Sequence, residues 1–292
     1  MKAGLNGSKL MPSQLNILVA YPYLKPDVIR YLQKFNNDYP DVLCFFLDSG
    51  AFTAFNSGKT ITLDEYCNFI NSLPFKPWRY ILLDVIGNET KTKENYIDML
   101  DRGFSPVPVF THGSNWSDVN YYYEKSDFIC YGGLVGKKGS SKVINDIDKF
   151  MRYTKGRKAH LLGYTSIKYL KKFRPYSCDS SSWNSSLRYG NLMVYMGNGV
   201  MQTIDRKGFA ANPNQKLKDQ IRLMGCDLEK LKSKDGWSGG NSEIGAVGSA
   251  SWVKLSIDVE KNLGTKLFLA CAGLWQVELV CDSYLKISGL KK

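Results

Sequence analysis

Apolar residues along the chain are grouped in short, near-continuous runs, separated by stretches with helical periodicity. The apolar runs lie at residues 16–23, 42–50, 79–87, 105–113, 127–136, 159–166 and 175–181, with a last candidate at 191–204. Such runs are typical of parallel strands that are buried on both faces of a sheet. The periodic stretches lie between them, at residues 26–38, 62–73, 92–103, 141–156 and 165–173. The pattern therefore predicts strands that alternate with amphipathic helices.

This alternation predicts an α/β protein with a (β/α)8 barrel of the TIM type. A doubly wound open sheet is the alternative, although no GxGxxG motif follows the first strand. Thr62 is suited to be the N-cap of the second helix. The alternation stops near residue 205. We therefore expect a barrel region over residues 1–210 and a mostly helical extension over 211–292 that completes or caps the barrel.

The charge balance changes the picture from a generic α/β protein to one with a polyanionic partner. Thirty-nine Lys and Arg stand against 27 Asp and Glu, for a formal net charge of +12. An excess of this size favours nucleic acid before a membrane surface, with a basic protein that has no such partner as the alternative. No apolar run approaches the ~18 residues of a spanning helix, and no signal peptide is evident. A cytoplasmic location is expected, in the bacterial host if the protein is encoded by a phage.

The cysteines and histidines argue against a metal-stabilised or disulfide-stabilised domain. The seven cysteines are widely scattered and form no CxxC pair, and three of them, Cys44, Cys130 and Cys178, lie inside apolar runs. This distribution predicts buried free thiols in a reducing compartment. The two histidines are too few for a histidine-based metal site without help from cysteine.

Aspartates follow three of the predicted strands. Asp48, Asp84 and Asp179 each end an apolar run, and in a parallel barrel the carboxyl ends of the strands meet at one mouth. Converging carboxylates are unfavourable unless they bind a cation, share protons or face a ligand with donors. A magnesium site is one possibility. Substitution at an anomeric carbon is another, in which one carboxylate attacks C1′ and a second one transfers protons.

Short motifs at these strand ends resemble those of the tRNA-guanine transglycosylase (queuine tRNA-ribosyltransferase) superfamily. "DSGAFT" at 48–53 is similar to the DSGGFQ motif of that family. It is followed in the family's order by "LLD" at 82–84, "FTHGS" at 110–114, "GGLVG" at 132–136, "HLLG" at 160–163 and "SCDSS" at 177–181. The resemblance covers residues 16–185 and is closest to the phage and bacterial DNA-guanine transglycosylase (DpdA-like) branch.

The resemblance implies a role for each matching residue. Asp179 would be the nucleophile that attacks C1′, and Asp48 the acid and base that transfers protons to and from the exchanged bases. Asp84 would bind N1–H and the 2-amino group of the base. The remaining base contacts are implied for the Gly133 N–H at O6, the Leu134 carbonyl near the 7-substituent, Phe52 and Leu162 on the two base faces, and Ser49, Gly163 and His112.

The chain also departs from the family. His112 replaces a base-reading glutamine, and residues 51 and 53 are Ala and Thr in place of Gly and Gln. The family's zinc module of three cysteines and a histidine has no counterpart, since no histidine follows His160. We therefore expect no metal and no cofactor. Contacts to a nucleic acid are predicted for Lys137, Lys138, Lys171, Lys172 and Arg174 at phosphates, and for Trp183 as a stacking or wedging residue at an extruded base.

Three functions remain open at this point. The preferred one is an enzyme, a DNA-guanine transglycosylase that exchanges guanine in DNA for a 7-deazaguanine of the preQ0 type through a covalent glycosyl-aspartate. The second is a tRNA-guanine transglycosylase that lacks the zinc module. The third is a non-catalytic barrel that binds nucleic acid, which the retention of three potentially buried carboxylates disfavours. The expected partners are thus DNA, or tRNA as the alternative, and a 7-deazaguanine base, without a membrane.

Overall fold

The computed structural model describes residues 14–111, 113–134, 141–211, 214–239 and 242–290, and its centre is a curled sheet of eight parallel strands. The order across the sheet is β3-β2-β1-β10-β7-β6-β5-β4. All pairings between neighbouring strands are parallel. The strands are β1 (Leu15–Ala20), β2 (Leu43–Asp48), β3 (Arg79–Tyr80), β4 (Val109–Thr111), β5 (Phe128–Gly132), β6 (Lys158–Leu161), β7 (Ser177–Ser180) and β10 (Lys266–Cys271). The predicted α/β class with a parallel sheet is confirmed.

The two edge strands of the sheet approach each other but share little pairing. Ile81, next to β3, and Val107, before β4, form one isolated parallel bridge. The Leu82 N–H donates to the Val107 carbonyl at 3.0 Å, and the Val107 N–H donates to the Tyr80 carbonyl at 2.8 Å. The sheet therefore has the curl of a TIM-type barrel, but a continuous ladder between β3 and β4 does not close it.

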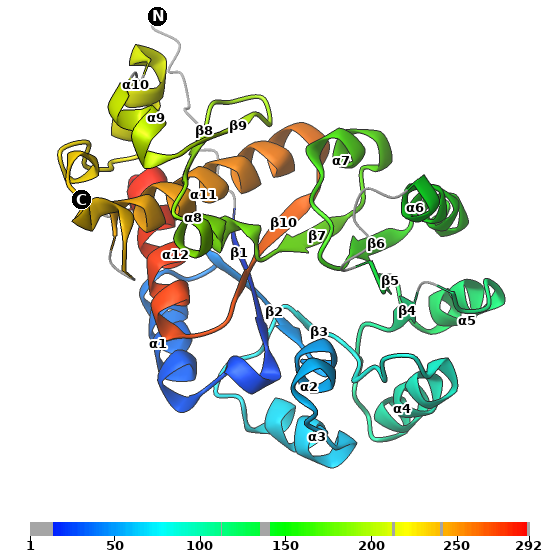
Figure 1. Cartoon of the computed structure of the whole chain (residues 1–292). Helices are drawn as coiled ribbons and strands as arrows, with labels where there is room; N and C mark the ends of the chain where they lie inside the picture. The colour runs from blue at the N-terminus through cyan, green and yellow to red at the C-terminus, as the bar shows by residue number, and fades with distance from the viewer. Residues whose placement is uncertain (1–13, 112, 135–140, 212–213, 240–241, 291–292) are drawn as a thin grey trace, which may run out of the picture.

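Helices lie around the outside of the curled sheet (Figure 1). They are α1 (Pro26–Asp38), α3 (Leu63–Ser72), α4 (Glu89–Asp101), α5 (Ser117–Lys125), α6 (Ser141–Thr154), α7 (Ile167–Phe173) and α12 (Leu274–Ile287), with the short α2 (Ala51–Ser57) following β2. Thr62 caps α3 as predicted. Its side chain accepts from the Glu65 N–H while the Glu65 carboxylate accepts from the Thr62 N–H, which completes a capping box.

The eighth strand of the sheet comes from a different part of the chain than predicted. The segment 191–204 forms a separate antiparallel hairpin of β8 (Leu192–Tyr195) and β9 (Met201–Ile204). Instead, β10 enters the sheet between β1 and β7, directly after the 21-residue helix α11 (Glu243–Leu263). The reason is burial: β10 presents almost only apolar side chains, which are buried in the sheet where it pairs with both β1 and β7.

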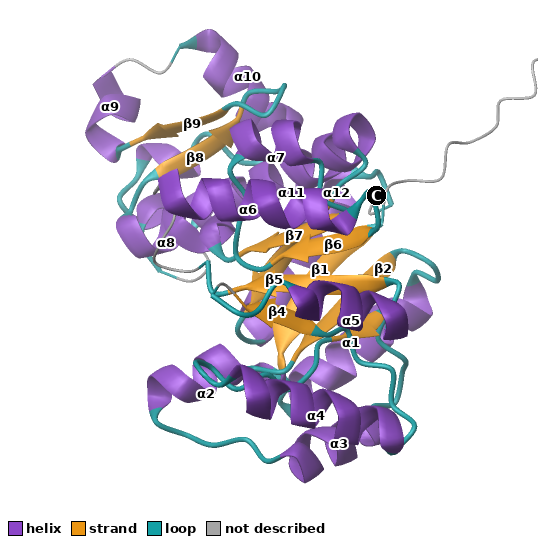
Figure 2. Cartoon of the chain, turned by 90° about the vertical axis from the view of Figure 1, so that its right-hand side faces the viewer, coloured by secondary structure: helices purple, strands orange, loops and turns teal. Residues whose placement is uncertain are grey.

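The hairpin belongs to a second, smaller core. Buried residues of the hairpin, including Leu192 and Val194, pack with side chains from α10 (Gln215–Leu223) and the start of α11. Figure 2 shows β8, β9, α9 (Arg206–Ala211) and α10 together at one end of the molecule, away from the large sheet. Whether residues 1–210 and 211–292 behave as separate regions stays a prediction.

The larger core has an outer and an inner part, because side chains alternate along each strand. The outer part lies between the sheet and the helices. The inner part lies inside the curl of the sheet and contains Leu18, Phe46, Phe128, Cys130 and Phe268. All seven cysteines are free thiols, and Cys44, Cys130 and Cys178 are buried as predicted. None of the helices in the described part of the chain combines the length and apolar character needed to cross a membrane.

Candidate functional site

The strand periodicity points a row of polar side chains into the curl of the sheet. On β2, Phe46 belongs to the inner core, so Asp48, two residues later, lies on the same face. On β7, Cys178 belongs to the outer core, so Ser177 and Asp179 point inward. Asp84 follows β3 in the loop that leads to α4. The three carboxylates therefore lie at the same edge of the sheet, and we refer to Asp48, Asp84 and Asp179 as the carboxylate cluster.

Asp48 is the most perturbed member of the carboxylate cluster. Its pKa is raised from 3.8 to about 7, mainly by burial and then by the negative charges of Asp84 and Asp179. Hydrogen bonds from the backbone N–H groups of Gly50 and Ser49 act in the opposite direction. A carboxyl group with this pKa is present in both protonation states near neutrality and is suited to transfer protons.

The turn after Asp48 requires glycine. Gly50 has a φ of +78°, in the left-handed region, and forms the N-cap of α2. A Cβ at this position would lie 2.3 Å from Cδ of Pro22. The glycine thus allows the chain to reverse directly behind the carboxylate, which explains the Asp-Ser-Gly sequence physically.

Asp84 is held by its own loop and by the same turn. Burial raises its pKa to about 6, and the Ser49 hydroxyl, which donates to Oδ1 at 3.3 Å, lowers it. The Asn95 side chain donates to the Leu83 carbonyl at 2.9 Å and fixes the backbone just before Asp84. At neutral pH this carboxylate is mostly ionised and is able to accept hydrogen bonds from a ligand.

Asp179 is buried, with 8% of its surface exposed, and is anchored through one oxygen. The Gly163 N–H donates to Oδ1 at 2.7 Å. Nε2 of His160 lies 3.1 Å from the same oxygen. The sequence-based assignment included Gly163 but gave no role to His160, although His160 begins the "HLLG" motif and alternates inward on β6.

The residues predicted to contact the faces and edge of a base lie on several different elements. Phe52 lies on α2 and is 48% exposed, Leu162 is partly buried against the inner core, and Leu134 is buried. Gly133 is exposed and has a φ of +77°. Their roles stay predictions, and His112 lies outside the described residues.

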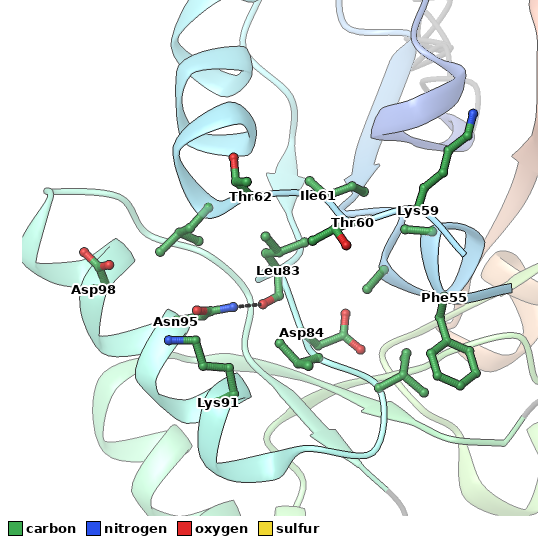
Figure 3. Close-up of a pocket in the computed structure, with 15 residues that line it drawn as sticks. Phe55, Lys59, Thr60, Ile61, Thr62, Leu83, Asp84, Lys91, Asn95 and Asp98 are labelled. Carbon is green, nitrogen blue, oxygen red and sulfur yellow. Dashed lines mark hydrogen bonds between the residues drawn. The ribbon is translucent and has the colours of Figure 1, made fainter. Parts of the chain in front are cut away.

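A pocket of about 490 Å³ adjoins the carboxylate cluster through Asp84 (Figure 3). It lies between α2, the segment 59–63 and α4, and Asp48 and Asp179 do not line it. Its walls are mostly apolar, with the exposed Phe55 and the Lys59 and Lys91 side chains among the lining residues. The sequence analysis named none of these three residues.

Of the basic residues predicted to contact a nucleic acid, three lie on or at the end of α7 and two lie outside the described residues. Lys171 and Lys172 lie in the last turn of α7, where Lys172 pairs with Asp148 at 2.9 Å and Lys171 donates to the Asn198 carbonyl at 3.5 Å. Arg174 ends α7 in the left-handed conformation, with a φ of +46°. Lys137 and Lys138 lie outside the described residues.

Trp183 requires a correction. It was predicted to stack on or wedge at an extruded base, but its side chain is 1% exposed and belongs to the large core. Its indole Nε1 donates to the Ala270 carbonyl of β10 at 2.8 Å. A tryptophan in this position joins β7 to β10 and offers no face to a nucleic acid.

No protein-family model matches the chain, and a search of curated proteins finds no relative of it. Within the described residues, no group of three or more His, Cys, Asp and Glu side chains is arranged to hold a metal ion. The case for a function therefore depends on the geometry of the carboxylate cluster.

Proposed function

We propose that this protein is a base-exchanging transglycosylase that replaces guanine in DNA with a 7-deazaguanine. The observation that carries the proposal is that the three carboxyl groups of the carboxylate cluster have different protonation and hydrogen-bonding properties. Asp48 has a pKa of about 7, Asp84 has a pKa of about 6, and Asp179 is anchored through a single oxygen. A double displacement at C1′ requires one carboxylate that attacks and one group that transfers protons, and Asp84 adds an acceptor for the base.

The first displacement breaks the bond between C1′ and guanine. A carboxylate oxygen of Asp179 attacks C1′, and the electron pair of the C1′–N9 bond leaves with guanine. Protonated Asp48 donates its proton to the departing base, so that a neutral guanine is released and Asp48 is left ionised. Asp84, ionised at the same pH, accepts from the N1–H and 2-amino groups and holds the base during this step.

The second displacement restores the polymer. Ionised Asp48 removes the N9 proton of the incoming 7-deazaguanine, whose N9 attacks C1′. The C1′–O bond breaks, and its electron pair returns to Asp179. Protons and charges balance over the two steps, so that the overall reaction requires no further reactant.

The fold supports the proposal at a coarser level. The carboxyl ends of parallel strands are the edge at which barrel and open-sheet proteins have their active sites. We infer that the sheet is a (β/α)8 barrel whose weakest seam is the bridge between β3 and β4. The net charge of +12 supports a nucleic acid as the polymer, since association with a polyanion is favoured.

A guanine-exchange assay tests the proposal. The purified protein would be incubated with radiolabelled guanine in two parallel reactions, one with duplex DNA as the acceptor and one with total tRNA. Each reaction would then be chased with 7-cyano-7-deazaguanine. We expect label in DNA that the chase removes, and no label with an Asp179→Ala variant of unchanged circular dichroism. Label in tRNA alone would replace DNA by tRNA as the substrate. Absence of label from both polymers, or full activity of Asp179→Ala, would refute the proposal.

A further inference from the structure

His160 is a polar residue that is buried in the inner core beside Asp179. Its side chain is fully shielded from solvent. Nδ1 lies 2.8 Å from the Ser177 hydroxyl oxygen, and Nε2 lies 3.1 Å from Oδ1 of Asp179. The pairing of β6 with β7 places His160 directly opposite Ser177, two residues before Asp179 on the same inward face. Both ring nitrogens therefore have a hydrogen-bond partner, as buried polar groups generally do, and one of these partners is Asp179.

The hydrogen-bond partners determine where the imidazole proton lies. An ionised carboxylate only accepts, so Nε2 must carry a proton to donate to Asp179. The ring is surrounded by Phe46, Phe128 and Phe268, and the edge-to-face centroid distance to Phe46 is 5.2 Å. With this proton on Nε2, the ring accepts at Nδ1 from the Ser177 hydroxyl, which completes a chain from Ser177 through His160 to Asp179.

Both donors meet the same oxygen of Asp179. The Gly163 N–H and the His160 Nε2–H reach Oδ1, whereas no hydrogen bond to Oδ2 is found among the described residues. We infer that His160 is a positioning residue that fixes Oδ1 and thereby leaves Oδ2 as the attacking oxygen. This inference deepens the proposed base exchange and depends on it for the identity of the attacked atom.

The same arrangement serves the second half of the reaction. In the glycosyl-aspartate, Oδ2 is bonded to C1′ and Oδ1 is the ester carbonyl oxygen. When the C1′–Oδ2 bond breaks, negative charge returns to the carboxylate and spreads onto Oδ1. The His160 and Gly163 donors are already in place to stabilise that charge without rearrangement.

The first test is spectroscopic and does not depend on catalysis. The chain has two histidines, so the ring nitrogens of ¹⁵N-histidine-labelled protein give two sets of signals, which a His112→Gln variant assigns. We expect a proton on Nε2 of His160, and a marked shift of the Nε2 signal in Asp179→Asn. A proton on Nδ1 alone, or a His160 signal that Asp179→Asn leaves unchanged, would overturn the inference.

The second test separates positioning from packing. His160→Gln keeps an N–H donor close to the position of Nε2, whereas His160→Leu fills the space without a donor. His160→Leu removes a hydrogen bond to a charged group, and we expect this loss to slow guanine exchange by about 10- to 100-fold. We expect His160→Gln to recover most of the rate. Equal rates for the two variants, with equal near-ultraviolet circular dichroism, would show that His160 only packs. If the wild-type protein exchanges no guanine, the proposed function fails, and the ring spectra still decide whether His160 donates to Asp179.

Discussion

At the scale of single residues, Asp48 has the most strongly raised pKa of the carboxylate cluster. Burial and two neighbouring carboxylates hold its pKa at about 7, compared with 3.8 in an unfolded chain. The folded protein therefore retains a proton on Asp48 that the unfolded chain has lost. The stability that this proton on Asp48 contributes is present in full below about pH 4 and is lost as the pH rises through 7.

Replacement of Asp48 by Asn should therefore stabilise the fold and block turnover. The gain in free energy of unfolding should grow between pH 4 and 7 and reach on the order of 2–4 kcal/mol above pH 7. Urea unfolding at pH 5 and pH 8 measures it, and a base-binding titration should show retained affinity. A variant that is destabilised equally at both pH values, or that still exchanges guanine, would contradict the assignment.

The pH dependence of exchange should be bell-shaped with its maximum between about pH 6 and 7. Above the pKa of Asp48, about 7, the first step loses its proton donor. Below the pKa of Asp84, about 6, that carboxyl group is protonated and no longer accepts from the base. Single-turnover rates across pH 5–9 measure both limbs. A rate that is still rising at pH 9 would exclude Asp48 as the acid.

At the scale of elements, the short helix α2 is positioned by glycines at its two ends. Gly50 and Gly58 cap it in the left-handed conformation, with φ values of +78° and +66°. They differ in their surroundings, because a Cβ at Gly50 would collide with Pro22, whereas a Cβ at Gly58 would meet nothing within 4 Å. This pair offers a matched comparison at one helix.

Gly50→Ala should destabilise the protein more than Gly58→Ala. The left-handed conformation alone makes alanine unfavourable by about 1–2 kcal/mol, and the collision adds about 1–3 kcal/mol at Gly50 only. Thermal unfolding of both variants measures the difference. Gly50→Ala should also reduce exchange, since the turn carries Asp48 and Ser49. Equal losses of stability at the two positions would show that the Pro22 contact is unimportant.

At the scale of the whole molecule, the net charge of +12 is the feature that bears on the proposed binding of a nucleic acid. Lys171 remains without an ion pair among the described residues, whereas Lys172 pairs with Asp148. On a different helix, α1, Lys34 pairs with Asp38 and offers a control of equal charge.

Binding of duplex DNA should weaken steeply with salt, by about tenfold or more between 50 and 200 mM. Fluorescence anisotropy with a labelled duplex measures the slope of log affinity against log salt. Lys171→Ala should make that slope shallower by roughly one, as expected for one lost phosphate contact. Lys34→Ala should leave it unchanged. An affinity independent of salt would remove DNA as a direct partner.

The sequence alone determined most of the elements that carry the candidate site. Seven near-continuous apolar runs became strands of one parallel sheet, and the aspartates at three of their ends lie at one edge. These features depend on local periodicity and on chain order, which neighbouring residues encode directly. The Thr62 capping box was predictable for the same reason, since all of its atoms lie within one turn.

Only the tertiary structure decided which residues meet across long separations. The run Lys266–Cys271 is short and flanked by helices, and its pairing with β1 and β7 makes it a strand. Trp183 is buried, and its indole donates to the Ala270 carbonyl of β10, 87 residues further along the chain. The bond between His160 and Asp179 depends on the register of β6 with β7. Register is set by how the whole sheet packs, and a shift of β6 by one residue would turn the His160 side chain away from Asp179.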